Sequence, residues 1–118
     1  MTKNSKYQNR KYDLEDRTRT FAKSIREFVR TLPKVETFYD DINQLIRASG
    51  SVGANYIEAN ESLSKKDFVM RVKICRKEIK ECIYWFDLIA KEKAEKEGLT
   101  KEANELMHIF GAIITKCG

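Results

Sequence analysis

Turn-forming residues are scarce in this sequence, which has one proline and five glycines among 118 residues. β-Sandwiches and barrels need many turns, so this scarcity favours a fold of long helices. Cysteines are also few: Cys75, Cys82 and Cys117 are odd in number and cannot form a disulfide scaffold, which favours a reducing, cytoplasmic setting. No apolar run approaches the roughly 18 residues of a membrane span, and the basic N-terminus lacks the apolar segment of a signal peptide. We therefore expect one cytoplasmic domain with no membrane contact.

Motifs of the common enzyme classes are absent as well. The chain has no P-loop, no GxGxxG, no HExxH and no CxxC pair, and its single histidine, His108, excludes histidine triads and multi-histidine metal sites. Glu105 and His108 have the Glu-x-x-His spacing of di-iron bundles, but that site needs a second such motif and both residues should point outward. We therefore predict no cofactor, no metal and no enzyme activity. An enzyme that uses only carboxylates or lysines stays open, although no paired acid and base suggest one.

The net charge of +5 is spread unevenly along the chain. Residues 1–34 carry +6 and residues 64–81 carry +4, whereas residues 35–63 carry −4 and residues 82–118 carry −1. A polyanion would therefore meet a patterned surface, although charge on helical proteins is often only a solvated face.

Apolar residues recur at steps of three and four residues in four segments, as expected for helices with one buried face. The four series are Leu14, Thr18, Phe21, Ile25, Phe28 and Leu32; Phe38, Ile42, Leu45, Ser49, Val52 and Tyr56; Phe68, Val72, Cys75, Ile79, Cys82, Phe86 and Ile89; and Leu99, Ala103, Leu106, Phe110, Ile113 and Cys117. They predict an all-α fold, an antiparallel up-down-up-down four-helix bundle. The helices are expected at about 13–32, 37–61, 64–93 and 99–116, so residues 13–118 form the domain and residues 1–12 a flexible basic tail.

Local signals mark the expected helix boundaries. Pro33 ends the first helix. Thr37 with Asp40, and Ser64 with Asp67, resemble capping boxes at the starts of the second and third helices. Gly98 predicts a left-handed stop after a charged, frayed stretch.

A run of small residues interrupts the second helix at Ser49, Gly50 and Gly53. Glycine inside a helix costs about 1 kcal/mol relative to alanine, so two glycines need a reason. Close approach of a neighbouring helix is the main interpretation. A GxxG clamp on a nucleic-acid backbone is the alternative, but the module that uses it needs a sheet.

Basic residues form two rows on the faces turned away from the apolar series. Evenly spaced cations with few acids between them are typical of surfaces that bind phosphates. Aromatic stacking platforms do not accompany them, so sequence-specific readout of single strands is not supported. The candidate nucleic-acid-binding residues are Arg19, Lys23, Arg26 and Arg30 in the first helix, and Lys66, Lys73, Arg76, Lys77 and Lys80 in the third.

The third helix also carries a second apolar stripe, formed by Met70, Ile74, Trp85 and Leu88. A bundle helix needs only one apolar face, so a second one rich in Trp and Met predicts a partner surface. Self-association is the simplest use, because most soluble oligomers contain copies of one chain. A wide core face with exposed flanks is the alternative.

Three runs of residues carry a resemblance to a known family. They are the small-residue stretch at 45–59, the helix start at 64–68 and the run at 74–85. Together they closely resemble the bacterial four-helix-bundle proteins encoded in intervening sequences of large-subunit (23S) ribosomal RNA genes, over about residues 14–114. At Asn60 the sequence departs from the glycine that related sequences often carry soon after the Glu-Ala pair.

The resemblance implies a toroidal homopentamer of four-helix protomers with no established enzyme activity. It also implies similarity to the accessory proteins of diversity-generating retroelements, which are basic pentameric barrels associated with a reverse transcriptase and nucleic acid. The expected partners are therefore further copies of the chain, RNA or DNA, and a nucleic-acid enzyme. A protein-interaction module that binds no nucleic acid is the alternative.

Overall fold

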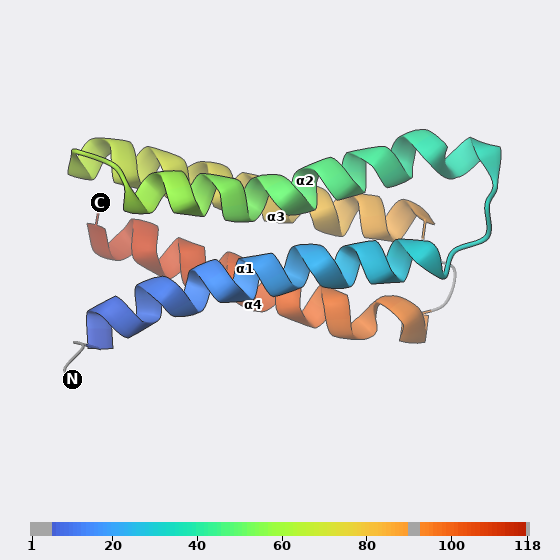
Figure 1. Cartoon of the computed structure of the whole chain (residues 1–118), viewed down its shortest axis with the longest axis horizontal. Coiled ribbons are helices and arrows are strands. Elements are labelled where there is room, and N and C mark those ends of the chain that lie inside the picture. The colour runs from blue at the N-terminus through green and yellow to red at the C-terminus, as the bar shows by residue number, and fades with distance from the viewer. Residues whose placement is uncertain (1–5, 90–92, 118) are drawn as a thin grey trace.

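Each of the four apolar series, apart from Leu32 and Phe38 at the ends of two of them, lies in a long helix in the computed structural model (Figure 1). The structure describes residues 6–89 and 93–117, with side chains over 13–89 and 97–117. The helices are α1 (Lys6–Arg30), α2 (Tyr39–Asn60), α3 (Lys65–Ile89) and α4 (Lys93–Cys117), and a short 3₁₀ helix, η1 (Glu36–Phe38), precedes α2. No strand occurs in the described ranges. The predicted all-helical four-helix bundle is therefore confirmed at this level.

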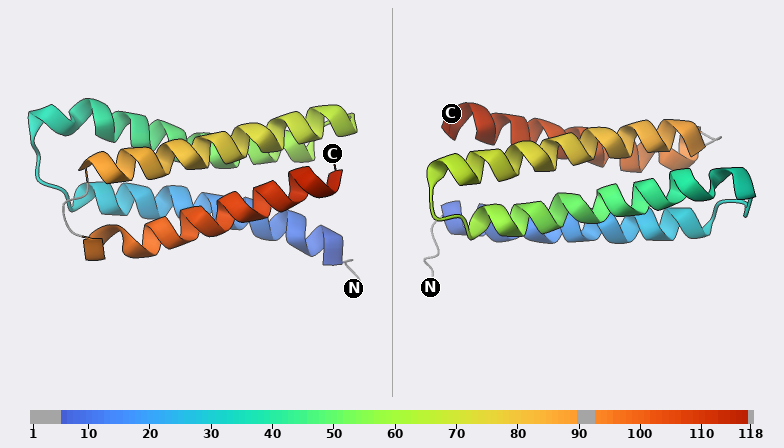
Figure 2. Two further views of the ribbon diagram at one scale, coloured as in Figure 1. Left: turned by 180° about the vertical axis from the view of Figure 1, so that it is seen from behind. Right: turned by 90° about the horizontal axis from the view of Figure 1, so that it is seen from above.

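The helices lie side by side along the 47 Å axis of the molecule. Figure 1 shows α1 and α2 in front of α4 and α3, with the chain reversing direction from each helix to the next. α2 packs most extensively against α3, whereas α1 and α4 meet over a shorter stretch. Both α1 and α3 therefore have α2 and α4 as neighbours and lie diagonally across the bundle from each other (Figure 2).

Aromatic side chains fill the centre of the bundle from diagonal helices. Phe21 and Phe28 of α1 each present an edge to Phe86 of α3, with ring centroids 6.5 and 6.0 Å apart. Tyr56 of α2 meets Phe110 of α4 at 5.8 Å. Such contacts add about 0.5–1.5 kcal/mol per pair to the burial of apolar area, so these rings hold together helices that are not neighbours.

The core follows the four predicted series closely. Every member of the third series from Val72 onwards is buried, and the second series is buried from Leu45 onwards. Leu32, Phe38, Phe68, Leu99 and Ile113, near the ends of the series, are only partly buried against the core. The helix ends therefore contribute less burial than the middle.

The helix boundaries differ from the sequence prediction in several places. α1 begins at Lys6, earlier than the predicted start at Asp13, while residues 1–5 of the predicted tail lie outside the described residues. Ser64 caps α3 as predicted, because its Oγ accepts a hydrogen bond from the Asp67 amide at 3.1 Å. Thr37 caps nothing: it lies within η1, and α2 begins without a side-chain cap. The 3₁₀ turn already satisfies the Phe38 amide, which donates to the Val35 carbonyl at 2.9 Å.

The predicted stop at Gly98 is wrong. Gly98 lies inside α4, and none of the glycines within the described ranges has a positive φ. The preceding lysines, glutamates and alanine are strong helix formers, so the helix continues through one unfavourable glycine.

The closest approach of two helices in the small-residue stretch occurs where Gly53 of α2 faces Thr18 of α1. A β-carbon on Gly53 would lie 3.1 Å from Thr18 Oγ1 and 3.4 Å from Thr18 Cβ. Thr18 cannot simply turn away, because its hydroxyl donates to the Leu14 carbonyl at 2.8 Å and the residue is buried. Gly50 is less crowded, with Arg26 Nη2 at 3.5 Å from the equivalent position. This geometry favours the packing interpretation of Gly53.

We predict that Gly53→Leu destabilises the bundle, because overpacking a tight helix contact costs about 1–3 kcal/mol. Gly50→Ala is the matched control, since its β-carbon has room and alanine favours the helix by about 1 kcal/mol. Thermal unfolding followed by circular dichroism measures both. A Gly53→Leu protein that melts at the wild-type temperature would contradict the packing role.

Candidate nucleic-acid interface

All five basic residues of the α3 row are exposed, on the side of the helix away from the core. Among the described residues, none of them takes part in an ion pair. Their charges are therefore neutralised only by solvent ions, which an incoming polyanion can displace. The α3 row consists of Lys66, Lys73, Arg76, Lys77 and Lys80.

Two of the four acids of α3, Glu78 and Glu81, form ion pairs with α2. Arg47 of α2 binds Glu78 Oε1 at 3.4 Å through Nη1 and Glu81 Oε1 at 2.9 Å through Nη2. Glu78 is only 6% exposed, so its carboxylate is removed from the surface potential. The seam between α2 and α3 therefore neutralises two acids of α3, while Asp67 and Asp87 stay exposed on the same helix as the row.

The α1 row is also exposed, but its members are more engaged. Arg19 pairs with Asp16 at 2.6 Å, and Arg30 approaches Glu27 at 4.0 Å. Arg26 donates from Nη1 to the Ala22 carbonyl at 2.9 Å and to Ser49 Oγ at 3.3 Å. Lys23 forms no ion pair with any described residue. Exposed pairs of this kind are weak, so they lower the potential of the row without fixing its side chains.

The structure does not bring the two rows together on one copy of the chain. α1 and α3 are diagonal partners in the bundle, so their outer faces point in different directions (Figure 2). A single nucleic-acid segment can follow either row, but both rows serve one ligand only if the ligand wraps the protein or bridges copies.

The α1 row borders a groove that sequence reasoning missed. The groove has a volume of about 310 Å³ and runs between α1 and α2. From α1 it is lined by Glu15, Thr18, Arg19, Ala22, Lys23 and Arg26. From α2 it is lined by Gly50, Gly53, Ala54 and Ile57. The basic row and the small-residue stretch were both visible in the sequence, but their meeting depends on how the two helices pack.

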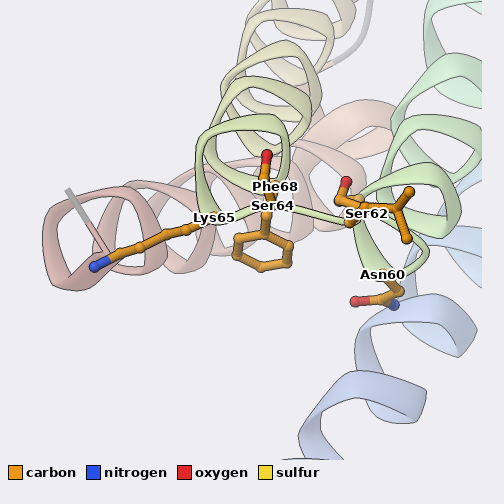
Figure 3. A pocket seen from close by; sticks show the side chains of 7 residues that line it. Asn60, Ser62, Ser64, Lys65 and Phe68 are labelled. Atoms are coloured by element: carbon orange, nitrogen blue, oxygen red, sulfur yellow. The ribbon is translucent and has the colours of Figure 1, made fainter.

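A second hollow, of about 300 Å³, lies at the turn between α2 and α3 (Figure 3). It is lined by Ala59, Asn60, Ser62, Leu63, Ser64, Lys65 and Phe68. Figure 3 shows Lys65 extending away from Asn60 and Ser62. The Asn60 amide is already bound to Glu15 Oε2 at 2.7 Å. Lys65 is therefore the only charged one of the described residues that line this hollow.

Comparison with known proteins identifies the family. The sequence pattern of the family described as 23S rRNA-intervening sequence protein matches residues 10–116. The chain belongs to this family. The resemblance carried by the small-residue stretch and the two runs that follow it is thus confirmed.

Among solved structures, this family member is similar to a crystal structure of a protein with unknown function from the S23 ribosomal protein family of Bacteroides thetaiotaomicron. The two sequences are 26% identical, and the match covers 85% of this chain and 96% of that chain with a TM-score of 0.77. No protein with a curated description matches the chain.

The second apolar stripe on α3 consists of two apolar halves, which polar residues separate. Met70 is 50% and Leu88 45% exposed, while Ile74 and Trp85 are half-buried. The exposed Lys77 and the half-buried Glu81 fall between the two halves on the same side of the helix. Self-association through this stripe stays a prediction.

Two features of the stripe were not expected from the sequence. Tyr84 is 56% exposed and presents an edge to Trp85 at a centroid distance of 5.0 Å, so the aromatic surface is larger than predicted. The indole Nε1 of Trp85 is buried and has no hydrogen-bond partner among the described residues. A buried donor without a partner costs about 1–3 kcal/mol.

Glu105 and His108, which have the spacing of a di-iron ligand motif, lie on the outer surface of α4. Glu105 and His108 are exposed, and Arg17 of α1 reaches Glu105 at 3.3 Å and Glu102 at 2.6 Å. The hydrogen bond to Glu102 raises the pKa of Arg17. No group of three His, Cys, Asp or Glu residues is arranged for a metal ion within the described part of the chain. None of the described helices is long and apolar enough to cross a membrane.

The two cysteines of α3 belong to the core. Burial raises the pKa of both Cys75 and Cys82 to about 12. Cys75 Sγ lies 3.4 Å from the Val52 carbonyl, to which it donates. Both thiols therefore stay protonated at neutral pH, which makes them poor metal ligands and poor nucleophiles.

We predict that only Cys117, which is half-buried, reacts readily with a thiol reagent at pH 8 in the native protein. All three cysteines should react after denaturation. Because the folded-state pKa of Cys75 and Cys82 lies above the unfolded value of 9.0, their contribution to stability is present below pH 9 and lost as the pH rises toward 12. Mass spectrometry of the labelled protein shows which cysteines have reacted in the native and in the denatured state. Rapid native labelling of Cys75 or Cys82 would show that α3 opens locally.

We predict that Trp85→Ala weakens self-association more than it weakens folding, because a buried interface Trp contributes about 2 kcal/mol or more. Tyr39→Ala, at another exposed aromatic on α2, is the control. Light scattering gives the mass and circular dichroism the melting temperature. A wild-type protein that is monomeric at micromolar concentration would rule out this interface.

Proposed function

We propose that the protein is a non-enzymatic, oligomeric bundle of antiparallel helices that binds the phosphates of RNA or DNA through its basic helix faces. The observation that carries the proposal is the α3 row, whose five cations are exposed and unpaired within the described residues. A row of free cations on a rigid helix gains free energy from counterion release when it meets a phosphate backbone.

The kind of recognition follows from the kind of contact. Lysine and arginine bound to phosphates position a nucleic acid but do not read its bases. Tyr84 follows Lys80 by one helical turn and so borders the row, and its exposed ring is a single stacking platform rather than a series that could read bases. Binding is therefore independent of sequence and strongly dependent on salt.

The family and its structural neighbour support RNA as the first ligand to test. The family is described by the intervening sequences of 23S rRNA, and the neighbour by a ribosomal protein family. Neither description concerns this chain directly. They support testing RNA among the polyanions that the α3 row favours on electrostatic grounds.

Assembly strengthens such a surface. Copies joined through the α3 stripe would present several basic rows to one polyanion, so that weak contacts sum to useful avidity. The resemblance noted above suggests a pentamer acting in the cytoplasm, alone or with a nucleic-acid enzyme.

A protein-interaction module without direct nucleic-acid binding is the second candidate. The exposed aromatic surface of Tyr84 beside Trp85 favours it, because aromatic residues are enriched at protein interfaces. The two candidates differ in their response to salt, since only phosphate binding releases many counterions.

We predict that a triple variant of the α3 row, Lys73→Glu, Lys77→Glu and Lys80→Glu, loses most of its affinity for RNA at low salt. Each lysine that meets a phosphate should also lower the slope of log affinity against log salt by about one unit. The matched control is Lys34→Glu, Lys101→Glu and Lys116→Glu, which changes the net charge equally at exposed positions outside both rows. Fluorescence anisotropy measures binding, and circular dichroism checks folding.

If the α3 variant and the control lose affinity to the same extent, the protein responds only to net charge and the row is not the binding surface. If neither loses affinity, the interaction-module candidate gains support.

A further inference from the structure

The groove between α1 and α2 differs from the α3 row in one respect: its cations stand beside a hollow. Arg19, Lys23 and Arg26 form one wall, at axial spacings of about 6 and 4.5 Å for a helical rise of 1.5 Å per residue. A stacked strand advances about 3.4 Å per nucleotide and an unstacked one more, so successive cations can meet successive phosphates.

Enough donors remain on this wall for a ligand. Arg19 uses Nη1 for Asp16, and Arg26 uses Nη1 for Ala22 and Ser49. A guanidinium has five N–H donors, so each arginine retains others, and Lys23 is not ion-paired with any described residue. The acid at the end of the groove, Glu15, is occupied by the Asn60 amide at 2.7 Å.

The floor of the groove carries no charge. Gly50, Gly53 and Ala54 leave nothing larger than a methyl group there, and Ile57 forms an apolar rim that is 46% exposed. A ligand that fits must therefore be anionic along one edge and uncharged along the other. A single nucleic-acid strand has this character, with phosphates on one edge and sugars and bases on the other.

We propose that the α1–α2 groove seats a short single-stranded stretch of nucleic acid, with its phosphates on Arg19, Lys23 and Arg26 and its sugars over Ala54 and Ile57. This site rests on the proposed function and assigns the α1 row to single strands. At about 310 Å³ the groove is at the lower end of ligand-site volumes, about 300–1,000 Å³, and admits no duplex. None of its lining residues is aromatic, so it grips the backbone without selecting bases.

The test uses the full-length protein with two probes, a fluorescein-labelled oligouridylate and an RNA duplex of the same length. Ala54→Glu places a carboxylate in the groove at an exposed helical position. Ala112→Glu makes the same change at an exposed position of α4 and is the matched control. We expect Ala54→Glu to weaken oligouridylate binding by about tenfold or more, which corresponds to at least about 1.4 kcal/mol. Duplex binding by Ala54→Glu, and both affinities of Ala112→Glu, should stay close to wild type.

Four other results of this experiment would contradict the groove site, and each would do so for a different reason. Wild-type affinity of Ala54→Glu for oligouridylate would remove the groove from the binding surface, and a loss in the α3 triple variant would then leave the proposed function intact. Equal losses for strand and duplex would remove the selectivity for single strands. A changed mass by light scattering would make the groove an interface between copies. Failure of the wild type to bind either probe would end the proposed function as well.

Discussion

The close contact between Gly53 and Thr18 sets the distance between α2 and α1, and this distance shapes the surface between the two helices. A β-carbon at position 53 would lie 3.1 Å from the nearest Thr18 atom, so a larger residue there would displace Thr18 or push α2 away from α1. The buried Thr18 hydroxyl is tied to its own helix, so the approach has little freedom to relax. Because the two helices are held at this distance, the basic row of α1 stands beside the small residues of α2 and the groove exists.

Charge is sorted by the same packing. Arg47 of α2 draws Glu78 and Glu81 of α3 into the seam between their helices. Arg17 of α1 does the same for Glu102 and Glu105 of α4. The seams therefore hold acids that would otherwise dilute the basic rows. Replacing either arginine would leave its two carboxylates without their partner and lower the positive potential of the surface.

The core and the placement of charge could be predicted from the sequence, because both follow from helical periodicity. The middle residues of the apolar series, such as Leu45, Ile79 and Leu106, are buried as predicted, and all nine basic residues of the two rows are exposed. The groove could not be predicted, because it depends on the distance between two helices. Gly98 misled the prediction of α4, since a glycine can either end a helix or be tolerated within one, and local sequence does not decide between these outcomes.

The proposed function requires this family member to bind RNA through cations that the helix packing leaves without ion pairs. The decisive experiment is the affinity of the wild-type protein for RNA across a series of salt concentrations. We expect log affinity to fall linearly with log salt, with a slope of about −0.7 for each phosphate contacted in a single strand. An affinity that does not change with salt, or no binding at the lowest salt, would contradict it.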